Sequence, residues 1–537
     1  MYKILFLLLS FICTSATHAQ PGAASKGSAI PRPKLVVGIV VDQMRWDYLY
    51  RYYNRYSAEG GFKRLLNNGF SCENTLVPYV PTTTACGHTS IYTGSVPAIN
   101  GITGNDWFDY DKNDYAYCTG DTSEKSIGSS SALGKMSPRN LLVTTIGDEL
   151  RLATNFHSKV VGIALKDRGA ILPAGHSANA AFWYDNTTGD WISSSYYMAE
   201  LPQWEKEFNA KKLVDKYYAQ DWTTLFPLNT YEQSAPDPKG FNHPLKQYTG
   251  KNFSIISATP HGNSFTLEMA MAAVTGEKLG GGEATDMLTV SLSSPDYIGH
   301  AYGPNSIEAE DGFLRLDKDL GDFFHFLDDK IGKGQYLLFL TADHGVANSP
   351  GFMKEHKIPT GNFDNEKVTD TINAILKAKT NTADIVLGII NYQVFLDRKV
   401  IKDAKLNKDS IETWVMNSLM STPGVERVFL LNTLNKITLN STQKEALTNG
   451  YFPQRSGDIQ ILFKPQWIDS FLKGGTTHGV WNPYDAHIPL LWYGWNVHPG
   501  KSNREVYMTD IAPTIAAMLH IQMPSGSIGH VIEEVTK

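Results

Sequence analysis

Residues 287–300 read MLTVSLSSPDYIGH and residues 336–345 read YLLFLTADHG, and these two stretches decide the fold. Each begins with a short apolar run whose length and content of β-branched or aromatic residues predict a buried strand. A third such run, KLVVGIVV, leads directly to Asp42. Along the chain, strands of this kind alternate with amphipathic helical segments. This alternation predicts an α/β fold in which a mostly parallel central sheet is sandwiched by helices.

Acidic and imidazole side chains follow these strands, namely Asp42, Asp296 with His300, and Asp343 with His344. The carboxyl ends of parallel strands meet at one edge of a sheet, where α/β enzymes bind their ligands. Carboxylates and imidazoles without cysteine pairs are the donors that zinc or a similar divalent ion prefers. The sequence therefore predicts a metal site at one edge of the sheet.

The composition is ordinary for a soluble globular protein. Of 537 residues, 42% are hydrophobic and 19% are charged, and the net charge is -6. A chain without a basic surplus offers no field that would attract a polyanion, so nucleic-acid binding is not expected. The sequence leaves the oligomeric state open, and a monomer is compatible with it.

The first residues are typical of a secretory signal. Lys3 precedes the apolar run ILFLLLSFIC, which is too short to span a bilayer and is followed by small residues up to Ala19. We expect residues 1–19 to be a cleaved signal peptide and residues 20–33, rich in Pro, Gly and Ser, to be a linker. An uncleaved anchor is the alternative, which the length of the run disfavours. The expected product is secreted to the periplasm without a stable membrane anchor.

Three cysteines remain after removal of the signal: Cys72, Cys86 and Cys118. An odd number permits at most one disulfide within the chain. Cys72 with Cys118 is the pair to test, and the sequence leaves it open.

Residues 34–537 are expected to form one catalytic domain with two insertions. Residues from about 169 to 285 are rich in Trp, Tyr, Asn and Pro and lack a clear periodicity, and residues from about 350 to 475 contain short helices and strands of their own. We expect both insertions to cap the active site rather than to form independent domains.

Residues 80–94, VPTTTACGHTSIYTG, contain a candidate nucleophile. A proline and hydroxyl residues just before a helical segment place a side-chain oxygen at a helix N-terminus, where backbone N–H groups favour an anion. A nearby metal ion would lower the pKa of that hydroxyl and make it nucleophilic. A run of threonines also suits strands and helix caps, so these residues alone do not identify the reactive one.

The complete set of motifs resembles the alkaline phosphatase superfamily. The resemblance is greatest to its secreted, PafA-type phosphomonoesterases with a threonine nucleophile, and nucleotide pyrophosphatase/phosphodiesterases are more distant. The motifs are VDQMRWD, PTTTACGHTSIYTGSVPAINGITGN, LKDRGAILPAGH, SPDYIGHAYGP, TADHG and GTTHG. They extend over nearly all of the mature chain.

The resemblance assigns roles within the nucleophile segment. It implies that Thr84 is the nucleophile, because Thr84 lies four residues before His88 in the T-x-x-x-H pattern. It also implies that Asn105, in the pattern G-I-x-x-N, binds the oxyanion. Cys86 lies close by, but the sulfatase pattern is missing, so a formylglycine is not expected.

The resemblance also implies two zinc ions, the first held by Asp296, His300 and His478 and the second by Asp42, Asp343, His344 and the oxygen of Thr84. Asp296 and His300 are four residues apart, so one helical turn would place them on one face. Asp343 and His344 are adjacent and would point to opposite faces of a regular strand. They can reach one ion only if the backbone leaves extended geometry, which Gly345 permits.

Lys166 and Arg168 follow the apolar run KVVGIAL. They are two residues apart, so in an extended chain they would point the same way. The resemblance implies that both contact the non-bridging oxygens of the substrate phosphate. A phosphate monoester carries one more negative charge than a diester, so this pair favours monoesters.

We therefore expect a metal-dependent alkaline phosphatase that hydrolyses small-molecule phosphate monoesters through a covalent phosphothreonine. One alternative is a phosphodiesterase or nucleotide pyrophosphatase of the same superfamily. Another is a non-catalytic relative that binds phosphate or metal, although no expected nucleophile or ligand is missing.

Overall fold

The computed structural model describes residues 30–232, 234–235, 240–470 and 475–536. The predicted signal peptide and residues 20–29 of the predicted linker lie outside the described residues. The chain from Pro33 onward forms one compact unit, which contains all the described helices and strands around the site. No helix among the described residues combines the length and the apolarity needed to cross a membrane.

The centre of the compact unit is a sheet built on β1 (Leu35–Val41), whose seven residues are all buried. β1 runs parallel to β10 (Tyr336–Thr341) on one side and to β9 (Asp286–Leu292) on the other. β9 is followed by β6 (Val160–Ala164) and β7 (Ala180–Asp185), again in parallel. The prediction of a mostly parallel central sheet is confirmed, and the carboxyl ends of β1, β6, β9 and β10 share one edge.

Antiparallel pairs extend this sheet at both sides. β8 (Asp190–Ser194) pairs with β7, and β18 (Leu490–Gly494) pairs with β10. Beyond β18 lies β2 (Phe70–Leu76), which is antiparallel to β18 and parallel to β19 (Gly500–Tyr507). The parallel strands that bear on the site are therefore in the interior of the sheet, where packing on both faces holds them.

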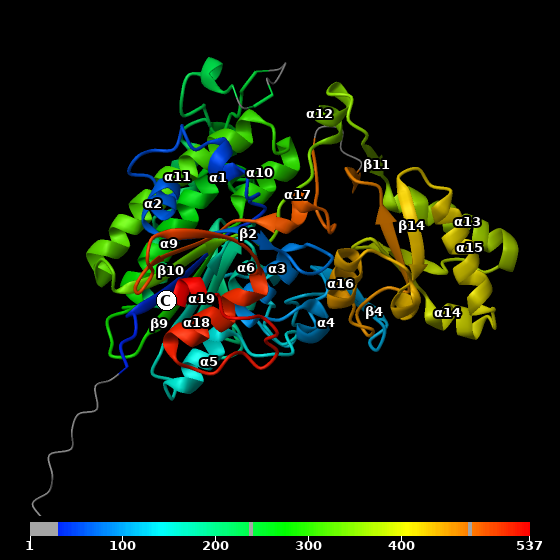
Figure 1. Ribbon diagram of the computed structural model, residues 1–537, viewed down its shortest axis with the longest axis horizontal. Coiled ribbons are helices and arrows are strands. Elements are labelled where there is room, and N and C mark those ends of the chain that lie inside the picture. Colours follow the sequence, from blue (N-terminus) through cyan, green and yellow to red (C-terminus); the bar gives the residue numbers. More distant parts are fainter. Residues whose placement is uncertain (1–29, 233, 236–239, 471–474, 537) are drawn as a thin grey trace, which may run out of the picture. The chain divides into compact units, whose positions relative to one another are not determined.

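Helices cover the sheet in two packed groups (Figure 1). The helices of the first group are α2 (Gly61–Asn68), α9 (His261–Gly276) and α11 (Ile307–Leu327). The helices of the second are α3 (Thr84–Thr93), α5 (Ile146–Ala153), α6 (Asp167–Ala174) and α18 (Ile511–Leu519). The longest, α11, begins where the Ser306 side chain accepts a hydrogen bond from the Ala309 N–H. Such a cap satisfies a backbone donor that the helix itself leaves open.

The two stretches predicted as insertions differ in their relation to the central sheet. Within residues 169–285, β7 and β8 extend that sheet and α9 packs on β9. Within residues 350–475 a separate antiparallel sheet has its own hydrophobic core, which includes residues of α13 (Asn365–Thr380) and α15 (Lys408–Met420). Its strands, in spatial order, are β12 (Val386–Ile390), β13 (Gln393–Leu396), β15 (Ile459–Phe463) and β14 (Val425–Leu430). A capping role for either stretch stays a prediction.

The three cysteines Cys72, Cys86 and Cys118 are buried, free thiols. The candidate pair Cys72 and Cys118 is thus not joined in this structure. Within the part of the chain that the structure describes, packing rather than cross-linking holds the fold together.

Candidate functional site

The strand ends bring four charged side chains to one edge of the sheet. Asp42 follows β1 directly, Asp343 lies two residues beyond β10, and Lys166 lies two residues beyond β6. Asp296 follows β9 in the first turn of α10 (Ser294–Tyr302). Ligands of α/β proteins bind at this edge, so the fold places these residues where chemistry is expected.

Two groups of side chains among the described residues could each hold a metal ion. The first ligand group consists of Asp42, Asp343 and His344, whose ligand atoms lie within 4.8 Å of one another. His344 Nε2 is 3.6 Å from Asp42 Oδ1 and 3.4 Å from Asp343 Oδ2. These three atoms are buried and have no hydrogen-bond partner. Buried polar atoms without partners are costly, and a divalent cation between two carboxylate oxygens and an imidazole nitrogen would satisfy all three. The residues present therefore fit a metal ion.

The second ligand group consists of Asp296, His344 and His478, so it shares His344 with the first. His478 Nε2 lies 3.6 Å from Asp296 Oδ1, and His300 Nε2 lies 3.1 Å from the same oxygen. The two histidines predicted to share an ion with Asp296, His300 and His478, thus both approach its Oδ1 atom. His344 stands between the two groups, and its ring stacks on that of His478 with centroids 3.6 Å apart.

The three imidazoles present the same nitrogen to the site. In each ring Nδ1 lies at hydrogen-bond distance from a backbone carbonyl oxygen. The acceptors are Gly345, Thr476 and Thr82 for His344, His300 and His478, at 2.9, 2.9 and 2.6 Å respectively. Donation from Nδ1 fixes the tautomer and leaves the Nε2 lone pair free to bind a cation.

Three buried carboxylates, those of Asp42, Asp296 and Asp343, lie close together, so a neighbouring positive charge would stabilise their ionised forms. Burial, together with the neighbouring Asp296 and Asp343 carboxylates, raises the pKa of Asp42 well above its usual range. Lys166 supplies one such positive charge, because its Nζ lies 2.7 Å from Asp42 Oδ2 and 2.5 Å from Asp296 Oδ2. Burial opposes the charge on Lys166, but the carboxylates of Asp296 and Asp42 outweigh it and raise its pKa. The site is built for positive charge.

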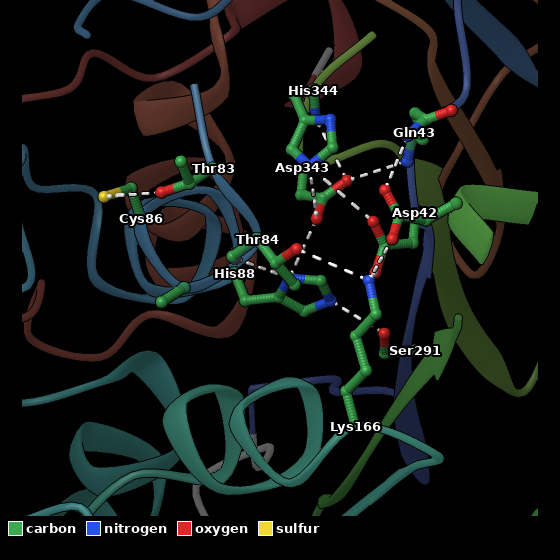
Figure 2. A network of polar contacts seen from close by, with 12 residues as sticks. Asp42, Gln43, Thr83, Thr84, Cys86, His88, Lys166, Ser291, Asp343 and His344 are labelled. Atoms are coloured by element: carbon green, nitrogen blue, oxygen red, sulfur yellow. Dashed lines mark hydrogen bonds and ion pairs between the residues drawn. The ribbon is translucent and has the colours of Figure 1, made fainter. Parts of the chain in front are cut away.

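Thr84 is the first residue of α3, as the nucleophile segment predicted. Its side chain is buried, and Oγ1 lies 3.5 Å from Lys166 Nζ (Figure 2). Gly87, one turn into the helix, allows α3 to approach Asp343 closely. A Cβ added at Gly87 would lie 2.5 Å from both Cβ and the carbonyl oxygen of Asp343. The N-terminus of α3, where the dipole favours an anion, is thereby held against the first ligand group.

His88 ties this helix to the sheet. His88 Nδ1 lies 2.9 Å from the Thr84 carbonyl oxygen, and Nε2 lies 2.8 Å from Ser291 Oγ on β9. Asp343 Oδ2 is 3.3 Å from His88 Nδ1. Figure 2 shows this ring below Asp343, between α3 and Ser291. His88, which pointed to Thr84 in the sequence, therefore contacts both the Thr84 backbone and Asp343 of the first ligand group.

Asn105 contacts the first turn of α3 and precedes β3 (Asp106–Asp109). Its Oδ1 accepts a hydrogen bond from the Ala85 N–H at 3.0 Å. Because this contact uses the acceptor end of the carboxamide, the NH₂ end is the part that can donate to an oxyanion at Thr84.

The backbone is extended at Lys166 but helical at Arg168, so the predicted reason for their common direction, one continuous extended segment, is wrong. Lys166 is the N-cap of α6, and Arg168 lies in the first turn of that helix. Because the helix begins between them, the side-chain alternation of an extended strand does not apply to this pair. Lys166 accordingly turns to Asp42 and Asp296, whereas Arg168 Nη1 donates to Tyr117 Oη at 3.0 Å.

Sequence reasoning missed Gln43. Its Nε2 donates to Asp296 Oδ1 at 2.6 Å, and its backbone N–H donates to Asp343 Oδ1 at 3.1 Å. Gln43 adopts a φ of 66°, which is uncommon for a residue other than glycine. Its place immediately after the strand-end Asp42 was the available signal. Gln43 links the carboxylates of the two ligand groups.

Comparison with known proteins confirms the resemblance inferred from the motifs. A family model described as type I phosphodiesterase / nucleotide pyrophosphatase matches residues 36–484. The chain is 52% identical to alkaline phosphatase PhoV of Synechococcus elongatus, covering 100% of both chains. It is 51% identical to alkaline phosphatase PafA of Elizabethkingia meningoseptica, covering 95% of this chain and 96% of that one. A Myroides odoratus protein named calcium-transporting ATPase is 51% identical, covering 94% of this chain and 95% of its own.

A solved structure agrees over the same length. The crystal structure of wild-type alkaline phosphatase PafA matches with a TM-score of 0.92 at 50% identity, covering 95% of this chain and 100% of that one. A mutant of PafA substituted at one threonine, one asparagine, one lysine and one arginine matches with a TM-score of 0.91. The chain thus belongs to the type I phosphodiesterase / nucleotide pyrophosphatase family, within the alkaline phosphatase superfamily.

Proposed function

We propose that this protein is a secreted, metal-dependent alkaline phosphatase that hydrolyses phosphate monoesters, with Thr84 as the nucleophile. Relatives that are about half identical over their full length are named alkaline phosphatases. The observation that carries the proposal is the position of Thr84. Its hydroxyl lies at the N-terminus of α3, 3.5 Å from the Lys166 ammonium, and α3 packs against Asp343 of the first ligand group.

The donor set supports two divalent cations, for which zinc is the best match. Asp42, Asp343 and His344 would hold one, and Asp296 and His478 with His300 the other. Such ions, when bound, supply charge stabilisation to a phosphoryl group and lower the pKa of a hydroxyl. The orphaned buried atoms Asp42 Oδ1, Asp343 Oδ2 and His344 Nε2 support this assignment independently of any relative.

The side chains divide the reaction between them. Thr84 Oγ attacks phosphorus, the P–O bond to the alcohol breaks, and the threonine ester that results is then hydrolysed by water. Asn105 donates its NH₂ to a non-bridging oxygen, and Lys166 and Arg168 supply positive charge for the dianion. His88 holds the backbone of Thr84 through the contact at its carbonyl oxygen. Phosphoryl transfer requires chiefly this kind of positioning and charge stabilisation.

The family description favours one other function, hydrolysis of phosphodiesters or nucleotide pyrophosphates. The Lys166 ammonium, 3.5 Å from Thr84 Oγ1, argues for monoesters, since a monoester dianion carries more charge than a diester. The name of the Myroides relative adds ATP as a substrate to be tested.

One purified sample can decide between these functions. The exported protein should be assayed on an aryl phosphate monoester, the matching aryl diester and ATP, with its metal content and N-terminal residue measured on the same material. The proposal expects kcat/KM for the monoester to exceed that for the diester by orders of magnitude. A preference for the diester would assign the chain to the phosphodiesterases instead, and an intact Met1 would contradict export with signal cleavage.

A further inference from the structure

The Arg168 guanidinium is held by a tyrosine that separates it from the neighbouring carboxylate. Arg168 Nη1 donates to Tyr117 Oη at 3.0 Å, and the same nitrogen is 3.9 Å from Asp167 Oδ1. Tyr117 Oη in turn lies 2.7 Å from Asp167 Oδ1. The phenol hydroxyl therefore stands between the cation and the adjacent anion, which do not form a close ion pair.

The direction of each hydrogen bond follows from the carboxylate. An ionised carboxylate only accepts, so the single proton of the Tyr117 hydroxyl goes to Asp167 and its lone pairs face Arg168. Thr119 Oγ1 donates to the second oxygen of Asp167 at 2.6 Å. With both oxygens engaged, Asp167 polarises the phenol as an acceptor for the guanidinium. Arg168 Nε is buried without a hydrogen-bond partner, so the guanidinium is not saturated by its surroundings.

One hairpin ends with Tyr117 and is directly preceded by Asn105. It consists of β3 and β4 (Asp114–Tyr117), which pair so that Asp106 stands opposite Tyr117. Next to this pair, the Cys118 N–H donates to the Asn105 carbonyl oxygen at 2.9 Å. The hairpin is anchored by the buried side chain of Trp107. The hairpin thus joins Asn105, whose side chain contacts the Ala85 N–H, to the tyrosine that contacts the guanidinium.

From this arrangement we infer that Tyr117 is a positioning residue. Its hydroxyl holds the Arg168 guanidinium at a fixed position relative to Asn105, so that both side chains can contact the substrate phosphate. The inference rests on the proposed function, because it concerns the phosphate contact of Arg168. Arg168 Nη1 and Asp167 Oδ1 are 3.9 Å apart, so loss of the phenol hydroxyl would let them form a direct, shorter ion pair. That pair would direct the donors of Arg168 away from the phosphate.

A double-mutant cycle tests the coupling. Tyr117→Phe keeps the ring and removes only the hydroxyl, and it is combined with Arg168→Ala. We expect Tyr117→Phe to lower monoester kcat/KM by about tenfold in the wild-type background and by less than about twofold in the Arg168→Ala background. Diester turnover should change little. Equal losses in the two backgrounds would overturn the inference, because Tyr117 would then act independently of Arg168.

The hairpin offers a matched control. Tyr115 lies two residues earlier on β4, is exposed, and donates its hydroxyl to the Leu387 carbonyl oxygen at 3.0 Å. Tyr115→Phe makes the same chemical change without touching Arg168, and it should leave both activities near wild type. If Tyr115→Phe and Tyr117→Phe lowered monoester turnover equally, the hydroxyls would matter only for hairpin stability and the inference would fail.

A binding measurement separates this inference from the proposed function. The affinity for inorganic phosphate, measured by calorimetry at equal metal content, should show the same coupling between Tyr117 and Arg168. Coupled phosphate binding in a protein that does not hydrolyse monoesters would contradict the proposed function and support the positioning role. Phosphate affinity and turnover that are both unaffected by Arg168→Ala would overturn the positioning role.

Discussion

The Lys166 ammonium nitrogen lies 3.5 Å from the Thr84 hydroxyl oxygen, in a buried site. The same nitrogen contacts the carboxylates of Asp42 and Asp296, which belong to the two different ligand groups. Lys166 therefore connects the proposed nucleophile with both groups. A fixed positive charge at this distance stabilises negative charge on the hydroxyl oxygen, since the surrounding protein screens it far less than water would.

The first prediction concerns the nucleophile. Thr84→Ala should lower monoester turnover by roughly a thousandfold or more, because no other oxygen occupies the first position of α3. Thr84→Ser should retain much of the activity, since the hydroxyl remains. Thr82→Ala should have a milder effect, because Thr82 Oγ1 donates to the Val480 carbonyl oxygen instead. Steady-state kinetics of the three variants give the comparison.

Acid quenching during turnover, followed by mass spectrometry of the peptides, locates the phosphate directly. Phosphate is expected on Thr84. Phosphate on Thr82 or Thr83 would show that the spacing to His88 identified the wrong hydroxyl.

The second prediction concerns metal. Removal of metal with a chelator should abolish activity, and zinc should restore it, because carboxylates and imidazoles dominate both ligand groups. His478→Ala should weaken one of two zinc sites by roughly a hundredfold or more, which a zinc titration with a competing chelator measures without any activity assay. His157 is exposed, so His157→Ala should leave both affinities unchanged. Full activity in metal-free protein would exclude the proposed mechanism.

The third prediction concerns the close approach of α3 to Asp343. Gly87→Ala introduces a Cβ 2.5 Å from two atoms of Asp343, so either the helix or the ligand must move. We expect the free energy of unfolding to fall by about 1–3 kcal/mol and zinc affinity to fall with it. Gly282→Ala is the control, since its Cβ would have 4.0 Å to the nearest heavy atom. Urea unfolding of metal-free and zinc-bound protein separates the two effects. Unchanged zinc affinity in Gly87→Ala would mean that the helix yields rather than Asp343.

Much of the site could be predicted because its residues follow strands with a clear apolar pattern. Asp42, Asp296 and Asp343 lie at or near the ends of β1, β9 and β10, so the topology of a parallel sheet brings them together. His478 has no such signal. It lies in a loop far along the chain, and only the resemblance to a family pointed to it.

Tertiary contacts explain what the sequence did not reveal. Gln43 is not ionisable, and its role depends on a positive φ and on two carboxylates from distant segments. Arg168 was misplaced because the apolar run before it suggested a continuing strand. The acidic Asp167 in the first helical turn was a local cue for a helix start that was not used. β7 was also missed, since its sequence AAFWYD has no alternating pattern and all six of its residues are buried.

The fourth prediction concerns the pH dependence of stability. Glu205 on α7 (Gln203–Ala210) is buried, and burial raises its pKa to about 8 from an ordinary value of 4.5. Between these two values the folded protein retains a proton that the unfolded chain has released. The unfolded state therefore binds fewer protons, and the free energy of unfolding falls as the pH rises through this window.

Glu205→Gln removes this dependence while keeping an acceptor for Asn209, whose Nδ2 donates to Glu205 Oε1 at 2.6 Å. We expect the variant to gain stability over wild type progressively from about pH 5 to about pH 8, in urea unfolding of the metal-free protein. Glu207→Gln changes an exposed carboxylate on the same helix and should run parallel to wild type. A Glu205→Gln curve that also ran parallel to wild type would show that Glu205 is ionised in the folded protein.

The last prediction concerns the preference for monoesters. If Lys166 and Arg168 serve the extra negative charge of a monoester, replacing both with Ala should reduce monoester kcat/KM on the order of a hundredfold more than diester kcat/KM. Zinc affinity should not fall, because neither residue is a ligand and loss of the Lys166 charge leaves Asp42 and Asp296 more attractive to a cation. Lys318→Ala combined with Lys333→Ala removes two exposed positive charges and serves as the control for net charge. All variants are assayed on both substrates at matched zinc occupancy. An equal loss on monoester and diester would show that Lys166 and Arg168 shape the site but do not discriminate between substrates by charge. The case for a monoesterase would then depend on the relatives alone.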